Sequence, residues 1–138
     1  MNRSELETII REIIAEKAAA PCPIKLGDVP QVAFSEADRL DTGDPASQVF
    51  TRDLFSLTDS PRLGAGVMEM TATTFPWKLD YDEVDYIIDG ELTIYCGKTS
   101  VTAKAGQALV IPKGSKILFS APRHARFLYV TYPADWQS

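Results

Sequence analysis

The chain has 138 residues, of which 45% are hydrophobic and 24% are charged, and its formal net charge is −5. These values are typical of one globular domain with its own core, and the negative charge disfavours a nucleic acid partner. No apolar run is long enough to cross a membrane, and we predict no secretory signal. Cys22 and Cys96 lie far apart in the sequence. We therefore expect free thiols in a cytoplasmic protein, and no zinc site.

Residues 2–18 have the pattern of an amphipathic helix. Ser4 followed by Glu7 predicts a capping box at its start, and Pro21 and Pro23 predict its end. A helix this short is marginally stable alone, so its apolar face should pack on its own domain or, as a detachable sorting helix, on another protein. The apolar residues recur at the spacing of one helical face: Leu6, Ile9, Ile10, Ile13 and Ile14.

The segment MNRSELETIIREIIAEKAAAP resembles the N-terminal encapsulation peptides of bacterial microcompartment cargo. The similarity includes the polar stretch SELET, which helical periodicity alone does not require. Such peptides are short amphipathic helices joined to a cargo enzyme by a flexible linker. The resemblance implies that residues 1–20 are a targeting helix. It also implies that residues 1–18 bind microcompartment shell or cargo proteins, and that the protein lies in the microcompartment lumen.

Residues 21–48 form a mixed connector, in which residues 32–34 can be interpreted as a short strand. From residue 49 to residue 138 the hydrophobic period changes to two, and we expect strands separated by short turns. Asp89-Gly90 predicts a tight hairpin turn, and residues 121–123 predict another turn. About eight short strands at this spacing indicate an all-β sandwich or barrel. The strands are predicted at residues 49–57, 64–70, 83–89, 91–96, 100–104, 108–111, 116–119 and 126–132.

The spacing of glutamate, glycine and proline in this β region resembles the two motifs of the cupins, which are small jelly-roll barrels. Glu83 and Gly90 fit the first motif, and Gly106, Pro112 and Gly114 fit the second. The resemblance implies a single cupin barrel over residues 49–138, and a homodimer, because cupins commonly pair through barrel strands. At the shorter motif spacing, the positions of the three metal-binding histidines hold apolar residues: Trp77, Leu79 and Ile117. At the longer spacing, the first two positions hold Pro76 and Lys78. We therefore expect no transition metal held by imidazoles.

Three longer stretches resemble one group of cupins, the EutQ-like family of ethanolamine utilisation: FPWKLDYDEVDYIIDGEL, AKAGQALVIPKGS and RFLYVTYPADWQS. Members of this family are associated with microcompartments and have been assigned an acetate kinase activity. The resemblance implies transfer of a phosphoryl group between ATP and acetate, giving acetyl phosphate and ADP. Many members carry an additional N-terminal region, where this chain has the amphipathic helix instead. Two alternatives stay open: a non-catalytic binding or assembly cargo protein, and a metal-free sugar epimerase or isomerase.

Glu83 and Asp85 are the leading candidates for chemistry. Side chains alternate along a strand, so both should point to the same face, and the cupin resemblance places that face inside the barrel. Two carboxylates in a cavity of low dielectric cannot both stay charged without compensation. They should share a proton or bind a hard cation such as Mg²⁺, which Asp80 and Asp82 could help to hold. The alternative is a structural role, with hydrogen bonds to barrel tyrosines and to the backbone.

The other candidate site residues surround this strand in the sequence. Tyr81 is predicted to be catalytic together with the two carboxyl residues, and Trp77 is predicted to line a substrate slot at the barrel mouth. Lys78 and Lys113 are candidate contacts for a phosphate group. The segment GKTS at residues 97–100 lacks the first glycine and the following helix of a phosphate-binding loop, so we interpret it as a hairpin turn. The one histidine, His124, is predicted to lie in a solvent-facing loop.

Overall fold

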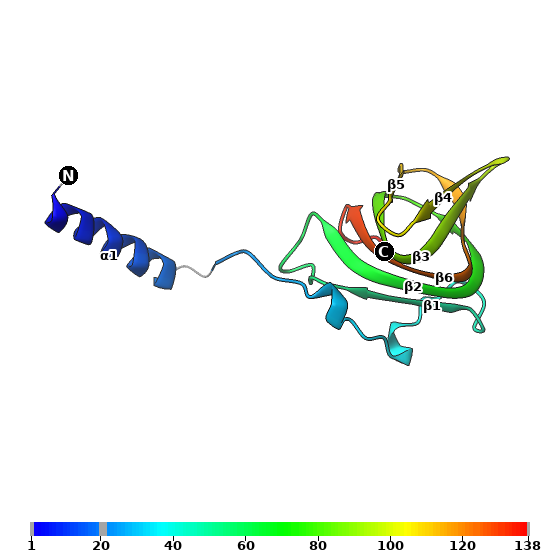
Figure 1. The fold of residues 1–138 in the computed structure, drawn as a ribbon, viewed down its shortest axis with the longest axis horizontal. Coiled ribbons are helices and arrows are strands. Elements are labelled where there is room, and N and C mark those ends of the chain that lie inside the picture. Colours follow the sequence, from blue (N-terminus) through cyan, green and yellow to red (C-terminus); the bar gives the residue numbers. More distant parts are fainter. Residues whose placement is uncertain (1, 20–21, 138) are drawn as a thin grey trace.

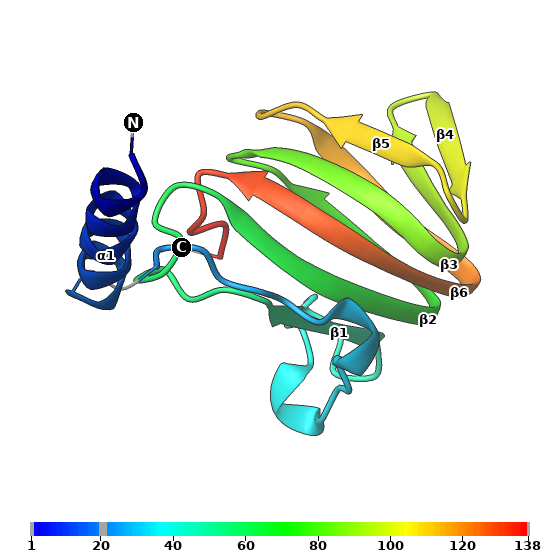
Figure 2. The same ribbon diagram turned by 60° about the vertical axis from the view of Figure 1, so that its left-hand side comes forward.

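The computed structural model describes residues 2–19 and 22–137, and it has one helix followed by six strands (Figures 1 and 2). All pairs of neighbouring strands are antiparallel, in the order β1-β2-β6-β3-β4, with β5 also paired to β3. The sheet curls around one apolar core, as Figure 2 shows. The elements are α1 (Arg3–Ala19), β1 (Gln48–Asp53), β2 (Gly64–Lys78), β3 (Asp82–Cys96), β4 (Thr99–Lys104), β5 (Ala108–Ile111) and β6 (Lys116–Tyr132).

The start of α1 differs from the predicted cap. The Asn2 side chain accepts a hydrogen bond from the Glu5 backbone N–H at 2.8 Å, and the Glu5 carboxylate accepts one from the Asn2 backbone N–H at 3.0 Å. This reciprocal capping box lies closer to the N-terminus than the one expected from Ser4 and Glu7. Ser4 lies inside the helix, and Glu7 pairs with Arg3 instead. The Ser4 prediction was wrong because Asn2 is an equally good cap residue and precedes it.

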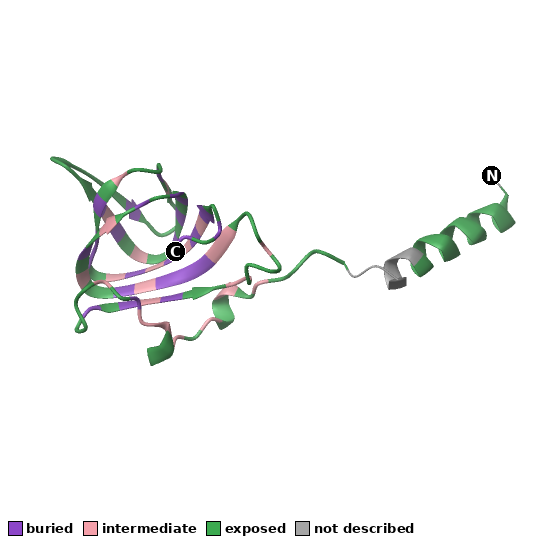
Figure 3. Cartoon of the chain, turned by 180° about the vertical axis from the view of Figure 1, so that it is seen from behind, coloured by how far each residue is buried: buried purple, intermediate pink, exposed green. Residues whose placement is uncertain are grey.

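The apolar face of α1 packs on nothing within the described chain. Every described side chain from Arg3 to Ala15 is exposed, and the five aliphatic residues of the stripe are between 38% and 61% exposed. Figure 1 shows α1 standing apart from the sheet, and Figure 3 shows its described surface as exposed throughout. The structure therefore does not support the alternative in which the apolar face of α1 packs on its own domain.

Three strands are much longer than the sequence suggested. β3 runs through Asp89-Gly90, and β6 runs through residues 121–123, so neither predicted turn exists. At both places the register between β3 and β6 shifts instead, which bends the strands without ending them. Asp89-Gly90 and residues 121–123 do mark irregular backbone. The prediction failed because the same residue types occur in bulges and in hairpin turns.

Gly90 is required at this bend. Its φ is +78°, and a Cβ at this position would overlap the backbone carbonyl oxygen of His124 on the neighbouring strand. His124 consequently lies in β6 and not in a loop, and its Nε2 is 2.7 Å from a carboxylate oxygen of Glu69. The prediction of a solvent-facing His124 was wrong, because the side chain is half-buried between Glu69 and Asp89.

Gly90→Ala is expected to lower the free energy of unfolding by more than Gly106→Ala. Both positions have positive φ, so both substitutions carry backbone strain of roughly 1–3 kcal/mol. A Cβ at Gly106 meets nothing within 4 Å, whereas at Gly90 it meets backbone. Urea unfolding of the two variants measures the difference. Equal losses would show that overlap with the His124 carbonyl adds nothing to the strain.

Residues of the connector lie against the sheet. Residues 32–34 form no strand, contrary to the prediction, and lie between two 3₁₀ turns, Val29–Gln31 and Glu36–Asp38. Phe34 packs near the Phe50 ring, with centroids 6.1 Å apart, and the Arg126 guanidinium lies 5.4 Å from the Phe34 centroid. Arg126 also donates hydrogen bonds to the carbonyl groups of Val29 and Val32. The segment that follows α1 is thus held on the outside of the sheet.

Candidate active site

Alternation along β3 brings Glu83 and Asp85 to the inner face of the sheet, as predicted from their spacing. Glu83 is 5% exposed and Asp85 is fully buried. Their neighbours on the same face, Leu79, Tyr81 and Ile87, are also buried. The two carboxyl groups therefore lie next to each other in the interior of the fold.

Two rows of residues cross the sheet at these carboxyl groups. In the first, Glu83 on β3 pairs with Thr131 on β6, which pairs with Gly64 on β2. A Cβ at Gly64 would overlap the Thr131 hydroxyl, so the glycine leaves room for that group. The row thus places one hydroxyl opposite one carboxyl group.

The second row follows the same plan two residues further along. Asp85 on β3 pairs with Tyr129 on β6, which pairs with Gly66 on β2, and Gly66 pairs with Asp53 on β1. A Cβ at Gly66 would overlap the Tyr129 hydroxyl. Because the glycine has no side chain, the tyrosine ring crosses β2 and its hydroxyl donates to Asp53 Oδ1 at 2.6 Å.

The two carboxyl groups have few hydrogen-bond partners. Glu83 Oε2, both oxygens of Asp85 and the Thr131 hydroxyl are buried without any partner when both carboxyl groups are ionised. The expected alternative, in which barrel tyrosines satisfy the carboxyl groups, does not hold for these oxygens, since the Tyr129 hydroxyl bonds to Asp53 and the Tyr81 hydroxyl accepts from Trp77. Unsatisfied buried oxygens are costly, so this cluster requires a proton or a ligand.

Burial sets the charge of the pair. Removal from water raises the pKa of Asp85 well above its usual range, and the neighbouring Glu83 raises it further, through its charge and through the hydrogen bond of a shared proton. Burial also raises the pKa of Glu83, although the same hydrogen bond with Asp85 works in the opposite direction there. Without a bound cation, Glu83 and Asp85 therefore share a proton at neutral pH.

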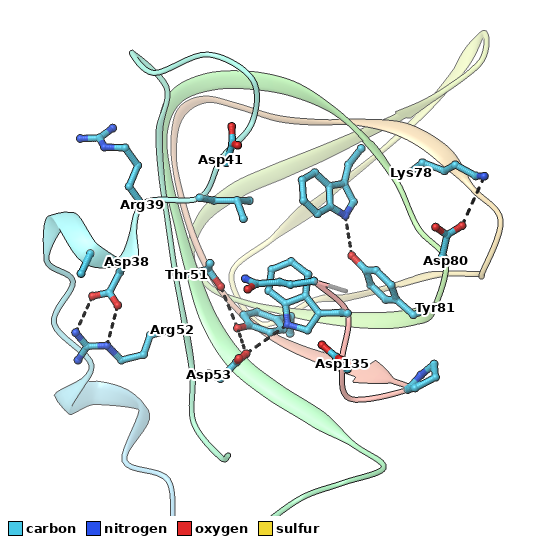
Figure 4. Close-up of a pocket in the computed structure, with 17 residues that line it drawn as sticks. Asp38, Arg39, Asp41, Thr51, Arg52, Asp53, Lys78, Asp80, Tyr81 and Asp135 are labelled. Atoms are coloured by element: carbon cyan, nitrogen blue, oxygen red, sulfur yellow. Dashed lines mark hydrogen bonds and ion pairs between the residues drawn. The ribbon is translucent and has the colours of Figure 1, made fainter. Parts of the chain in front are cut away.

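A cavity of about 810 Å³ lies at the mouth of the barrel (Figure 4). It is lined by Tyr81 from the β2–β3 connection, by Thr51 and Asp53 from β1, and by residues that follow β6. Glu83 and Asp85 are not part of this lining, but Tyr81 and Tyr129 are, and burial together with the charge of nearby Glu83 raises the pKa of both tyrosines. The rest of the lining comprises Ala37, Asp38, Arg39, Leu40, Asp41, Arg52, Trp77, Lys78, Asp80, Tyr129, Pro133, Asp135, Trp136 and Gln137.

Several aromatic side chains line the cavity. Trp77 Nε1 donates to the Tyr81 hydroxyl at 2.7 Å, and the Trp136 ring centroid lies 6.1 Å from those of Trp77 and Tyr81. Burial raises the pKa of Tyr81, and the charge of Glu83 raises it further, so this hydroxyl stays protonated at neutral pH. Trp77 and Tyr81 thus lie together at the cavity, as the sequence predicted.

The predicted phosphate-binding lysines are separated in the structure. Lys78 lines the cavity, with its Nζ 3.6 Å from Asp80. Lys113 is not among the residues that line it, and its backbone N–H instead donates to Asp82 at 2.8 Å. The cavity has two other cations, Arg39 and Arg52, which the sequence did not single out as site residues. Only one of the two predicted lysines is therefore placed to meet a ligand in this cavity.

Several site residues escaped the sequence analysis because they come from distant elements. Thr51 donates to the Tyr129 hydroxyl at 2.9 Å, and Asp53 accepts from both Tyr129 and Trp136. Thr131 lies opposite Glu83. The period-two pattern of β1 does place Thr51 and Asp53 on one face, and this was the only signal in the sequence that pointed to them.

The positions that hold the metal-binding histidines in cupins are occupied here by apolar side chains that pack against the core. Trp77 and Ile117 are register partners on β2 and β6, and Leu79 is fully buried. Among the described residues, no group of three His, Cys, Asp or Glu side chains is placed to hold a metal ion. The cupin domain of Cnp3 from Schizosaccharomyces pombe shares the fold, with a TM-score of 0.58 at 17% identity, over 77% of this chain and 67% of that one. Fold and site together define a cupin fold that lacks the metal-binding histidines and has a buried carboxyl pair.

The comparisons identify the family within this class. A family model described as ethanolamine utilisation protein EutQ matches residues 1–138, and the chain belongs to this family. A Clostridioides difficile (strain 630) protein named acetate kinase EutQ is 50% identical, over 100% of this chain and 96% of its own length. The structure of the Clostridium difficile EutQ protein has a TM-score of 0.82 and 56% identity, over 85% of each chain. This chain spans about half the length, 48%, of the relatives of the same name from Salmonella typhimurium and Escherichia coli.

The family places the chain in ethanolamine utilisation, and the fold confirms the predicted all-β cupin barrel behind an N-terminal helix. Within the described ranges, no helix is both long and apolar enough to cross a bilayer.

Proposed function

We propose that the protein catalyses reversible phosphoryl transfer between ATP and a small carboxylate, with acetate as the expected acceptor. The observation that carries this proposal is the buried pair Glu83 and Asp85, which has oxygens without hydrogen-bond partners and whose neighbours Tyr81 and Tyr129 line the cavity. The printed name of the Clostridioides difficile relative, which matches this chain over its whole length, supports the same reaction. A carboxyl pair of this kind can hold a divalent cation, which phosphoryl transfer from ATP requires, and the acceptor carboxylate is already ionised and needs no base.

The oxygens of the site fit the preferences of Mg²⁺. Glu83 and Asp85 would hold the ion, and the Thr131 hydroxyl would supply a third protein oxygen opposite Glu83. Mg²⁺ prefers carboxylate and hydroxyl oxygens and usually keeps several waters, so a set of only two carboxyl groups is sufficient. When bound with ATP, it neutralises charge on the transferring phosphoryl group.

The remaining predicted residues take positioning roles in this proposal. Lys78 lies at the cavity, where its ammonium group would meet a phosphate as a point charge. The protonated hydroxyl of Tyr81, held by Trp77, would donate a hydrogen bond to an oxygen of the transferring group. Lys113 lies outside the cavity lining, and we assign it no part in this reaction.

The direct test is acyl phosphate formation. The full chain is incubated with ATP, Mg²⁺ and acetate, and acetyl phosphate is trapped as its hydroxamate. Formation that depends on Mg²⁺ and on acetate supports the proposal. A purified protein that releases no acyl phosphate with acetate, or with other short carboxylates, would favour the alternative of a non-catalytic binding or assembly protein.

We also propose that the purified protein holds no stoichiometric iron, copper or zinc. The three histidine positions of the fold carry Trp77, Leu79 and Ile117, none of which binds these metals. Elemental analysis by mass spectrometry should give well under one transition metal ion per chain. A value near one would require a site other than the one that cupins use.

The exposed helix supports a separate proposal about location. α1 presents five aliphatic side chains to solvent, and such a stripe is stable only when a partner covers it. We propose that shell or cargo proteins of a microcompartment cover it and so place the barrel in the lumen. This role is compatible with catalysis, and it is the whole function in the non-catalytic alternative.

The outer face of the sheet supports a homodimer. Val84, Tyr86 and Ile88 on β3 and Val110 on β5 are exposed apolar side chains, and Val84 and Val110 are register partners. An apolar face of this kind is typical of an interface between identical chains. Sedimentation of the chain without residues 1–18 tests this proposal separately from any association through α1.

A further inference from the structure

The segment that follows β6 folds back across the mouth of the barrel. β6 ends at Tyr132, and four of the next five residues line the cavity: Pro133, Asp135, Trp136 and Gln137. Of these, Trp136 is 7% exposed and is therefore almost fully buried. The tail is therefore an ordered part of the site.

The Trp136 side chain makes several contacts between the tail and the barrel. The Trp136 ring packs edge-on against Tyr129 at 5.5 Å and lies 6.1 Å from Trp77 and from Tyr81. Its Nε1 donates to Asp53 Oδ1 at 3.3 Å. The backbone N–H of Trp136 bonds within the tail, to the carbonyl of Ala134. Side-chain packing, and not a strand ladder, thus holds the tail in place.

Two of the rings that Trp136 packs against are neighbours of the carboxyl pair. Tyr129 is the cross-strand partner of Asp85, and Tyr81 precedes Glu83 by two residues on the same inner face. Both tyrosines lie close enough to Glu83 for its charge to act on their hydroxyl groups. Moving the tryptophan outward would uncover two tyrosines that line the cavity beside Glu83 and Asp85.

We propose that Trp136 closes the site and decides whether the phosphoryl group goes to a carboxylate or to water. The inference rests on the proposed phosphoryl transfer. In the transfer, a carboxylate oxygen forms a bond to the γ-phosphorus while the bond from that phosphorus to the β–γ bridging oxygen breaks, and the electron pair leaves with ADP. In hydrolysis a water oxygen forms the same bond, loses a proton and gives inorganic phosphate. A closed site favours the first outcome because it excludes water.

The first measurement is the ratio of acyl phosphate to inorganic phosphate formed from ATP and acetate. Trp136→Leu keeps an apolar side chain but removes most of the ring, and should lower this ratio about tenfold. Trp136→Phe keeps an aromatic ring and should retain a ratio within about twofold of the parent. A Trp136→Leu variant that forms acyl phosphate at the parent ratio would overturn the proposal.

The second measurement does not depend on turnover. Carboxyl groups are amidated with a water-soluble carbodiimide and a small amine, and the modified sites are located by peptide mass spectrometry. Glu83 and Asp85 should be protected in the parent and modified several-fold more in Trp136→Leu, while the exposed Asp89 reacts equally in both. Equal protection of the pair in parent and variant would reject closure. If the parent forms no acyl phosphate, the proposed function fails, and this measurement alone decides about closure.

A third measurement leaves position 136 unchanged, in case Trp136→Leu does not fold. The chain has two tryptophans, so Trp77→Phe makes Trp136 the sole fluorescent indole. Acrylamide should quench it several-fold less than free tryptophan, as expected for a 7% exposed side chain. Quenching equal to that of free tryptophan in the folded protein would show that the tail is not closed, and would overturn the proposal.

Discussion

Asp85→Asn is expected to lower Mg²⁺-dependent acetyl phosphate formation by about 100-fold or more while the fold survives. Asparagine has the same shape as aspartate but no charge, and Asp85 is fully buried beside Glu83. In the proposed reaction its loss removes one of two carboxylates that hold Mg²⁺ near the transferring phosphoryl group. Initial rates at several Mg²⁺ concentrations, with circular dichroism of the variant, measure both parts of this expectation.

Asp89→Asn is the matched control, since Asp89 lies on the same strand but exposes 72% of its side chain. It should leave the rate of acyl phosphate formation within about twofold of the parent, because an exposed ion pair contributes little. An Asp85→Asn variant that turns over as fast as the parent would exclude a catalytic role for the pair. The carboxyl groups would then be structural.

The same substitution at Asp85 should change how stability depends on pH. The pKa values of Glu83 and Asp85 are raised in the folded state, so the folded protein binds more protons than the unfolded chain above about pH 4. Without added Mg²⁺, the stability contributed by this proton is present at low pH and is lost as the pH rises through the folded-state pKa values. Asp85→Asn should therefore make the melting temperature fall less steeply as the pH rises. The melting temperature of this variant at pH 8 should be higher than that of the parent. If the melting temperature of the variant fell with pH as steeply as that of the parent, groups other than Asp85 would be responsible for the pH dependence.

Deleting residues 2–18 should leave the melting temperature of the barrel nearly unchanged and abolish recruitment to microcompartments. Every described side chain of α1 is exposed, so the deletion removes little buried apolar area. One kcal/mol would move the melting temperature of a domain this size by several degrees, which makes calorimetry a sensitive measure. Fluorescence microscopy of tagged protein in cells with labelled shells measures recruitment.

A double substitution in the full-length chain separates the apolar stripe from the helix as a whole. Ile9→Ser with Ile13→Ser keeps the length and charge of α1 but interrupts its apolar face. It should reduce recruitment as strongly as the deletion does. A drop of several degrees in the melting temperature of the deleted protein would instead show that the stripe packs on the barrel in solution.

The sequence was sufficient for those parts of the fold that depend on local periodicity. Alternation along residues 83–87 placed Glu83 and Asp85 on one face, which the cupin resemblance put inside the barrel, and helical periodicity placed the apolar stripe on α1. Local signals failed where two structures use the same residues. Asp89-Gly90 suits a hairpin turn as well as a bulge, and only the pairing of β3 with β6, far apart in the sequence, selects the bulge.

The site was predictable only in the part that lies close to the carboxyl pair in the sequence. Trp77, Lys78 and Tyr81 are sequence neighbours of that pair and line the cavity, although the pair itself does not. Asp53 and Trp136 also line the cavity and are joined there by a hydrogen bond, although they are 83 residues apart in the sequence. Contacts of this kind depend on the register of the whole sheet, and Gly66 allows the crossing of Tyr129 only by lacking a side chain.

The strand order has a consequence for how the protein is made. β6, the last strand in the sequence, lies in the middle of the sheet between β2 and β3. During synthesis the barrel therefore cannot close until β6, which follows the other five strands in the sequence, has left the ribosome, and its long-range pairing is slow on the scale of single domains. α1 depends only on contacts between near neighbours and emerges before the barrel. A nascent chain thus presents α1 well before it has a folded barrel, so a partner that binds α1 would meet the protein while Asp53 and Trp136 are still apart.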